Sequence, residues 1–338
     1  MVTARDVARR AGVSDTIVSA VLKPTHAPLR CSQETRVKVL KAARELGYKR
    51  HPLYTAMRTG RTHIIGIYIA DASTLLSHPH AAYGLSNVHA ALTERGYSPL
   101  IASLDKPEIC DFRLMDGLII LDCRRDDAPL IEKAAKALPT FGWTGTPYEP
   151  VNGVYSPSKA LNEQAARVNH EIAAKYLYDL GHRSIALIEP WGGMANPALP
   201  IFRRIAEERG LKAELAEVFD HLSKRTYSRV MQFLDRNTLP TAFYALDDEV
   251  AHRIIEKLSW RGQSVPRDVA VFSRQTDMAG TDGASGITGI YTDWPAVWRS
   301  LVNQYVDVIE GKRTVEQIEV PTPSQRVMDR DTCARRTA

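Results

Sequence analysis

The chain has 338 residues, of which 44% are hydrophobic and 25% charged, and this composition excludes a disordered polyelectrolyte. No run approaches the roughly 18 uninterrupted apolar residues of a membrane span, and the start lacks the apolar core of a secretory signal, so we expect a soluble, cytoplasmic protein. Its four cysteines are widely separated and form no CxxC pair, which argues against a disulfide framework or a zinc site.

Basic residues concentrate at the start of the chain. Residues 1–61 carry thirteen Lys and Arg against four Asp and Glu, a net charge of +9, whereas the whole chain carries +5. The other 277 residues therefore sum to −4. A compact positive module on a mildly acidic body is typical of proteins that bind a phosphate backbone, so double-stranded DNA is the first partner to consider.

Residues 6–11 predict a short helix that stops at Gly12, where the chain must turn sharply. A second helix begins at once, because Ser14 is a suitable N-cap and apolar residues then recur on one face. Two helices joined by a tight glycine turn form a helix-turn-helix, whose second helix enters the DNA major groove by its N-terminal residues. The face left for DNA comprises Asp15, Thr16, Ser19 and Ala20.

A third helix is expected over residues 34–46, with Ser32 as its N-cap and Gly47 after its end. Its inward-facing residues are predicted to be Val37, Leu40, Ala43 and Leu46. An ordinary helical bundle with solvated charges is the alternative interpretation.

The next segment argues against that alternative. Residues 53–59 predict a single short turn of helix, too short to persist alone in water, which therefore needs a partner to fold. Met57 beside Arg58 suits a minor-groove reader that inserts an apolar side chain between bases and pairs a charge with phosphate.

After residue 62 the pattern changes to strands that alternate with helices, such as those expected at 81–95, 169–180 and 249–261. This repeat predicts doubly wound parallel sheets, with too many strands for one small domain, and hence two α/β lobes. The candidate strands are 64–70, 99–102, 117–121, 139–143, 184–189, 241–246, 269–273 and 288–291.

These segments resemble the lactose/galactose-repressor (LacI/GalR) family, in the motifs DVARRAGVS, TIVSAVL, ETRVKVLKAARELGY, AMRTGRTHIIGI, MDGLIIL, YLYDLGHRSIALIE and SVPRDVAVFS. The resemblance implies an N-terminal all-α helix-turn-helix headpiece and a two-lobed, periplasmic-binding-protein-like α/β core. The expected domains are a headpiece at 1–50, a hinge helix at 51–61, a first lobe at 62–157 and 288–318, and a second lobe at 158–287 and 319–338.

The resemblance places Met57 where paired hinge helices of a dimer insert an apolar side chain at the operator centre. The recognition helix departs from the family, because Ala20 replaces a base-reading Arg, Asp15 and Thr16 replace bulkier readers, and Ile17 replaces a phosphate-binding Thr. Phosphate would repel Asp15, which can instead accept from a cytosine amino group, so we expect an unusual half-site. The expected DNA-contacting residues are Thr3, Ser14, Asp15, Thr16, Ser19, Ala20, Arg30, Ser32, Met57 and Arg58.

In such a core a small-molecule effector binds in the crevice between the lobes, at the carboxyl ends of the strands. By the same resemblance, Ala198 stands in place of an effector-binding Arg, and Arg274 with Gln275 in place of a carboxylate, so a common sugar bound in the usual way is not expected. The expected effector-contacting residues are His80, Tyr83, Trp191, His221, Asp247, Arg274 and Gln275.

The sequence therefore predicts a transcriptional repressor that binds a pseudopalindromic operator as a homodimer, with effector control through the cleft. A ligand-independent DNA-binding regulator and a solute-binding receptor are the alternatives, and the basic headpiece opposes the second. An enzyme is not expected, because the acidic run 247–249 is an ordinary helix start and His78 with His80 is a weak metal spacing. No metal, cofactor or membrane partner is expected. The C-terminus lacks leucine heptads, which predicts a dimer without a coiled-coil tetramer.

Overall fold

A computed structural model describes residues 2–22, 31–48, 60–69, 79–102, 114–122, 127–142, 154, 158–189, 198–219, 228–245, 247–276 and 286–336. The chain forms two compact units, Met1–His63 and Ile64–Ala338. Across the described ranges, no helix has both the length and the apolar character that a membrane crossing requires.

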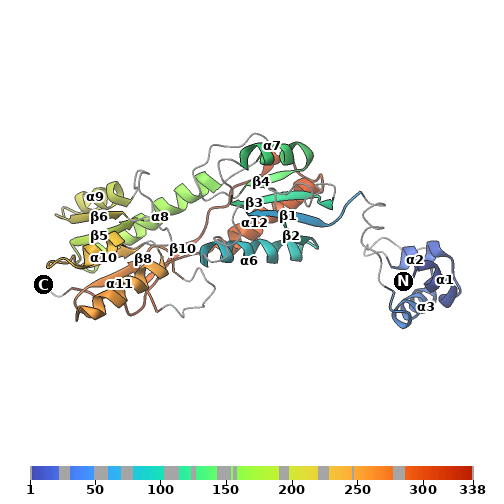
Figure 1. Cartoon of the computed structure of the whole chain (residues 1–338), viewed down its shortest axis with the longest axis horizontal. Helices are drawn as coiled ribbons and strands as arrows, with labels where there is room; N and C mark the ends of the chain where they lie inside the picture. The colour runs from blue at the N-terminus through green and yellow to red at the C-terminus, as the bar shows by residue number, and fades with distance from the viewer. Residues whose placement is uncertain are drawn as a thin grey trace. The chain divides into compact units, whose positions relative to one another are not determined.

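The first unit, called the headpiece here, contains three helices (Figure 1), which pack around a small apolar core. They are α1 (Ala4–Ala11), α2 (Asp15–Val21) and α3 (Gln33–Glu45). Each helix contributes one fully buried valine to the centre of this core: Val7, Val18 and Val39. The predicted three-helix arrangement is therefore confirmed.

The prediction that Val37 faces inward is wrong, because its side chain is 56% exposed. The buried face of α3 is formed by Val39, Ala42 and Ala43, with Leu46 packed at its border. These positions recur at three- and four-residue spacing, whereas Val37 lies two residues before Val39 and hence on the other side of the helix.

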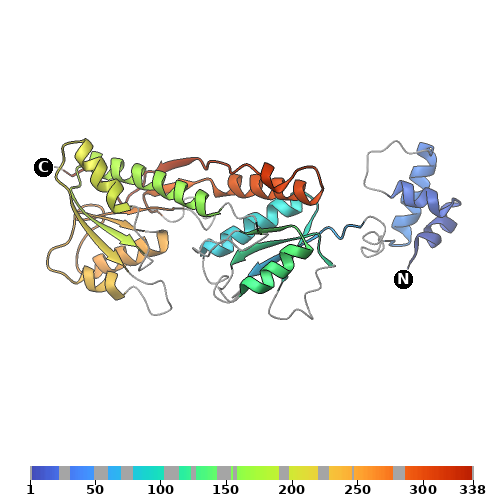
Figure 2. The same ribbon diagram turned by 90° about the horizontal axis from the view of Figure 1, so that it is seen from above.

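The first lobe of the second unit contains a four-stranded parallel sheet of order β2-β1-β3-β4. Its strands are β1 (Ile64–Ile69), β2 (Ser98–Ala102), β3 (Gly117–Asp122) and β4 (Thr140–Gly142). Helix α7 (Ala128–Ala137) covers one face, and α6 (Pro79–Glu94) with α12 (Trp294–Ile309) covers the other (Figure 2). Helices on both faces make the sheet doubly wound, as predicted.

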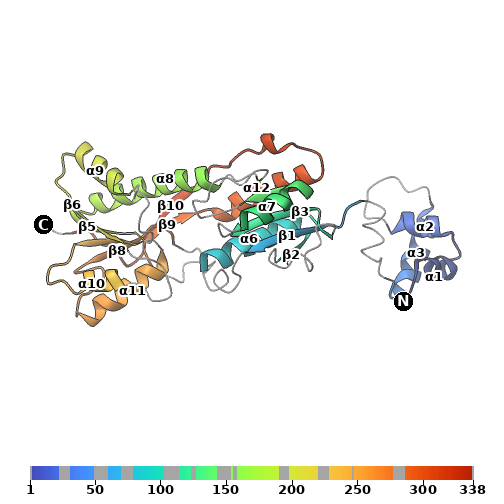
Figure 3. The same ribbon diagram turned by 45° about the horizontal axis from the view of Figure 1, so that its top comes forward.

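The second lobe contains a six-stranded sheet of order β10-β9-β8-β7-β5-β6, in which only β10 runs antiparallel to its neighbour. Helices α8 (Ser158–Asp179) and α9 (Ala198–Glu208) pack on one face, and α10 (Ser228–Leu234) with α11 (Asp248–Trp260) on the other (Figure 3). The strands are β5 (Ser184–Glu189), β6 (Glu214–Phe219), β7 (Ala242–Ala245), β8 (Ala270–Ser273), β9 (Gly289–Thr292) and β10 (Gln325–Met328). A short 3-10 turn, Val315–Gln317, precedes β10.

The polypeptide crosses from one lobe to the other at positions that differ from the expected boundaries at 158 and 288. Strand β9 was assigned to the first lobe, but it pairs with β8 and β10 in the second sheet, so the crossover lies after Thr292. Helix α8 belongs to both lobes, because Leu161 and Ala165 are buried in the core of the first lobe, and Ala173 and Leu177 in that of the second. The remaining domain boundaries stay a prediction.

Candidate functional site

Two capped turns fix the geometry of α1 and α2. The backbone N–H of Asp6 donates to the Thr3 hydroxyl, and the Asp6 carboxylate accepts from the Thr3 backbone N–H at 2.9 Å, which closes a capping box at the start of α1. Gly12 ends this helix with φ of 66°, a left-handed conformation that favours glycine. Ser14 then caps α2 by accepting from the Ile17 N–H at 3.4 Å. The two helices thus form the predicted helix-turn-helix.

The N-terminal end of α2 is turned toward solvent. Asp15 and Thr16 are exposed, and Ser19 and Ala20 are half-buried, whereas Val18 is buried in the headpiece core. A helix that enters a major groove contacts base edges with its N-terminal residues. The structure therefore leaves the predicted recognition positions accessible to a duplex.

Asp15 has a cationic neighbour that the sequence did not indicate. The Arg5 Nε atom of α1 lies 3.6 Å from the Asp15 Oδ2 atom, and both side chains are largely exposed. The guanidinium offsets a negative charge that a phosphate backbone would otherwise repel. Sequence spacing could not reveal this pair, because it joins two helices across the turn.

Headpiece cations exceed the carboxylates that can neutralise them. Glu45 of α3 accepts from Arg10 of α1 at 2.8 Å, and Glu34 lies 2.8 Å from Lys38. Arg36 and Arg44 are exposed, and neither forms an ion pair with another described residue. The described helices therefore keep unneutralised positive charge.

Four other predicted DNA contacts lie at the ends of elements or beyond the described residues. Ser32 is exposed and caps α3, where its hydroxyl accepts from the Thr35 N–H at 3.2 Å. Arg30, Met57 and Arg58 lie outside the described residues, so their predicted roles stay predictions.

Polar residues gather where two neighbouring strands of the second sheet end. Asp247 follows β7, Arg274 and Gln275 follow β8, and the Arg274 N–H donates to the Ala245 carbonyl at 2.8 Å. Asp247 is buried and caps α11 by accepting from the Val250 N–H at 2.9 Å. Ligands of open α/β sheets bind at the carboxyl ends of the strands, which is this edge.

A series of hydrogen bonds between side chains continues from this edge toward the C-terminal segment. The Thr276 hydroxyl donates to Asp248 Oδ2 at 3.0 Å, and Arg330 Nη1 donates to the Thr276 hydroxyl and to the Ile287 carbonyl, each at 3.0 Å. Thr276 and Arg330 could not be identified as site residues from the sequence, since segments far apart in the chain meet here.

Two buried polar residues of α8 lie under the sheet. His170 Nδ1 is 2.8 Å from the Tyr244 hydroxyl oxygen, and burial together with the nearby Arg274 guanidinium lowers the pKa of His170 to about 3. Asn169 is fully buried, its Oδ1 accepts from Gln325, and its Nδ2 has no hydrogen-bond partner among the described residues. Helical spacing could have indicated that Asn169 and His170 are buried, because they precede the buried Ala173 and Ala174 by four residues and so lie on the same face of the helix.

The other predicted effector residues are not brought to this edge by any described contact. Tyr83 is half-buried and packs against the core of the first lobe. His80 belongs to α6, but its side chain lies outside the described residues, as do Trp191 and His221. Ala198, at the place where the family resemblance expects an Arg, is fully buried at the start of α9.

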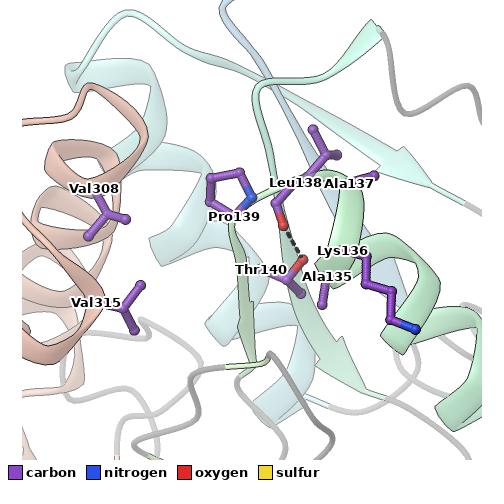
Figure 4. A pocket seen from close by; sticks show the side chains of 8 residues that line it. All are labelled: Ala135, Lys136, Ala137, Leu138, Pro139, Thr140, Val308 and Val315. Atoms are coloured by element: carbon purple, nitrogen blue, oxygen red, sulfur yellow. Dashed lines mark hydrogen bonds between the residues drawn. The ribbon is translucent and has the colours of Figure 1, made fainter.

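A shallow pocket of about 410 Å³ lies elsewhere, at the N-terminal end of β4 (Figure 4). Its only charged residue is Lys136, and its one hydroxyl, on Thr140, donates to the Leu138 carbonyl at 3.0 Å. Without convergent polar groups, this pocket lacks the character of a ligand site. Within the part of the chain that the structure describes, no group of His, Cys, Asp or Glu is placed to hold a metal ion.

Two family models match the chain. Residues 3–51 match the model for bacterial regulatory proteins of the lacI family, and residues 174–333 match the model for a periplasmic binding protein-like domain. The first match covers the three helices of the headpiece, and the second covers most of the second lobe together with α12.

Relatives of similar length are found among characterised proteins. The chain is 27% identical over 285 residues to the HTH-type transcriptional repressor PurR of Histophilus somni (strain 129Pt), which covers 80% of this chain and 81% of that protein. It is 25% identical over 343 residues to the catabolite control protein A of Priestia megaterium, covering 95% of this chain and 96% of that protein.

Solved structures share the fold over nearly the whole chain. A crystal structure of the lac repressor dimer bound to operator and the anti-inducer ONPF matches with a TM-score of 0.68 at 20% identity, covering 98% of this chain and 99% of that one. A complex of the transcriptional regulator CelR with cellobiose matches with a TM-score of 0.59 at 22% identity, covering 98% of this chain and 100% of that one. The predicted combination of helix-turn-helix and two-lobed core is confirmed.

Proposed function

Since the chain belongs to the lacI family of bacterial regulatory proteins, we propose that it represses transcription by binding a pseudopalindromic operator as a homodimer, under control of a small-molecule effector. The observation that carries this proposal is the helix-turn-helix whose second helix presents Asp15 and Thr16 to solvent. The headpiece supplies recognition, and the core supplies the response to the effector.

Recognition rests on the N-terminal end of α2. Asp15 and Thr16 approach base edges in the major groove, while exposed cations such as Arg36 and Arg44 supply attraction to phosphate. Arg5 accompanies Asp15 and reduces its repulsion by the backbone. Asp15 accepts from a cytosine amino group, so a C·G pair is expected at its position in each half-site.

The homodimer follows from the small size of one recognition helix. A single helix-turn-helix reads only a few base pairs, and two-fold symmetry doubles the contact. The edge strand β2 offers a surface for self-association, because Leu100 and Ile101 are 43% and 54% exposed beside a backbone edge that no other described strand pairs with.

Effector control is assigned to the strand ends that carry Asp247, Arg274 and Gln275. Three chain segments join the two lobes: α8, the link after β9, and the link before β10. A ligand that favours one arrangement of the lobes shifts their equilibrium and with it the operator affinity of the dimer.

Selection from random duplexes tests this function directly. The intact protein is expected to enrich an inverted repeat with a C·G pair at matching positions of both halves. Thr16→Ala is expected to weaken binding to the selected duplex about tenfold, the loss typical of one base contact, and to leave nonspecific binding nearly unchanged.

Thr93→Ala, on the exposed surface of α6, is the matched control and should bind like the unaltered protein. Recovery of duplexes without any symmetric motif would contradict the proposal, as would equal losses for the two threonine variants.

A further inference from the structure

Arg274 occupies the ligand-binding edge of the second sheet. It is the first residue after β8, and its N–H donates to the carbonyl of Ala245, the last residue of β7, at 2.8 Å. The backbone is therefore fixed at the point where the two central strands end. The side chain is half-buried, and its Nε atom is buried without a hydrogen-bond partner among the described residues.

No described carboxylate neutralises this guanidinium. Arg274 forms no ion pair with any residue that the structure describes, although two aspartates follow the neighbouring strand. Asp247 accepts from the Val250 N–H at 2.9 Å, and Asp248 accepts from the Thr276 hydroxyl at 3.0 Å. Both aspartates are engaged at the start of α11 and in the chain that leads to Arg330.

The buried ring of His170 lies near Arg274 and stays uncharged. His170 is fully enclosed, and its Nδ1 atom lies 2.8 Å from the Tyr244 hydroxyl oxygen. Burial and the positive charge of Arg274 keep the pKa of His170 near 3, so the ring is neutral at physiological pH. Among the residues that the structure describes, Arg274 is thus a half-buried positive charge without a counter-charge, an arrangement that costs free energy unless an anion binds.

We propose that the effector is a small acidic molecule and that Arg274 binds its carboxylate or phosphate group. This inference rests on the proposed effector control, and it names the chemical class of the ligand. A planar guanidinium donates two parallel hydrogen bonds to either group, which gives orientation as well as affinity. Neutral sugars lack the charge that this site needs.

Thermal unfolding and calorimetric titration of the full chain test the proposal. The probes are glucose, glucose 6-phosphate and gluconate, which differ in charge on a similar carbon skeleton, and inorganic phosphate and acetate at ionic strength matched with chloride. The unaltered protein is expected to be stabilised by a phosphate-bearing probe, a carboxylate-bearing probe, or both, and not by glucose. The two arms identify which acidic group the site prefers.

Three variants locate the effect. Arg274→Gln should bind the effective acidic probe at least tenfold more weakly, and Arg274→Lys should keep part of that affinity because it keeps the charge. Arg253→Gln removes an exposed guanidinium that is paired with Glu249 on α11, and it should respond like the unaltered protein. Arg274→Gln should unfold at no lower temperature than the unaltered protein without ligand, since it removes an unneutralised charge.

Stabilisation of the unaltered protein by no acidic probe would overturn the proposal, and so would an equal response of Arg274→Gln. Operator binding is measured separately without ligand, where Arg274→Gln should match the unaltered protein. Loss of the acid response with intact operator binding supports the inference. Failure of the unaltered protein to bind any duplex would reject the proposed function, whatever the titrations give.

Discussion

Asp15 gives helix α2 a negative charge at the end that is proposed to face DNA. It stands at the first position of α2, where a carboxylate interacts favourably with the helix dipole, and its partner Arg5 comes from α1. Both side chains are exposed, so their ion pair adds little to stability. In the proposed function, the pair lets a carboxylate approach DNA, because the guanidinium offsets its charge.

Asp15→Asn is expected to change the base preferred at one position of each half-site and to raise nonspecific affinity, since it removes one negative charge from the DNA-facing surface. Duplex selection followed by titration against random DNA measures both effects. Glu34→Gln removes a charge that is paired with Lys38 on α3 and should leave the selected motif unchanged. An unaltered motif in Asp15→Asn would refute the assignment of Asp15 as a base reader.

His170 makes the stability of the second lobe depend on pH. Its pKa falls from the ordinary value of 6.5 to about 3 in the folded protein, through burial and the charge of Arg274. Between these values the unfolded chain binds a proton that the folded chain excludes. Stability is therefore full above pH 6.5 and decreases as the pH falls toward 3, by about 1.4 kcal/mol per pH unit for one proton.

His170→Asn is expected to reduce this slope by about one proton, measured by denaturant unfolding at several pH values. His182, buried beside Thr241 with its pKa lowered to about 4, contributes a second proton that the variant retains. Tyr244→Phe removes the hydrogen bond but keeps the ring enclosed, so its slope should stay steep. Equal slopes for His170→Asn and the unaltered protein would contradict the account.

At the level of helices, two valines of the headpiece offer a matched comparison. Val18→Ala removes buried apolar volume from the centre of the core and should lower the free energy of unfolding of the headpiece by about 2 kcal/mol. Val37→Ala removes the same atoms from a side chain that is 56% exposed, and it should cost about 0.5 kcal/mol or less. Denaturation of the two variants, followed by circular dichroism, distinguishes them. Similar losses would mean that α3 packs with a different face inward.

The elements that sequence patterns predicted best are those with strong local signals. The caps at Ser14 and Ser32 and the glycine turn at Gly12 all lie where the sequence placed them. The face of α3 was misjudged at Val37, because a helix with several apolar positions permits more than one inward phase.

The strands that the sequence did not indicate both lie at edges of the second sheet. Strand β6 carries the exposed Glu214 and Glu217, and β10 begins with Gln325 and Arg326, so neither shows a continuous apolar run. The interior strands were predicted because burial on both faces demands such runs. No local pattern in the sequence shows which sheet β9 joins. Its assignment to the first lobe was wrong, because β9 pairs with β8 of the second sheet.

The candidate site was also predictable only in part, because some of its contacts have no local signal in the sequence. Asp247 and Arg274 follow recognisable strands, and the rule for parallel sheets brings their positions together. Arg5, Asn169 and Arg330 meet their partners through tertiary contacts between different elements. No spacing in the sequence reports such contacts.

For the whole molecule, the edge of the first sheet is expected to mediate dimer formation. Ile101→Lys places a charge on the exposed edge strand β2 and should raise the dissociation constant of the dimer at least tenfold. Sedimentation over a concentration series measures this change. Val320→Lys, at a residue that is 39% exposed outside the strands, is the control and should leave the dimer intact. A dimer unaffected by Ile101→Lys would move the interface to another surface.

The charge distribution of the molecule indicates how the complex forms. A net charge of +9 on residues 1–61, against −4 on the rest, concentrates the attraction to phosphate in the headpiece. Specific affinity should therefore fall steeply as salt is raised. In the proposed dimer, two headpieces on one duplex should double this dependence relative to one.

The mass of the complex with a selected duplex, measured in solution across a salt series, tests this account most directly. We expect two chains on one duplex, with an affinity that decreases linearly against salt on logarithmic axes. A complex containing one chain, or no complex with any duplex at low ionic strength, would contradict it.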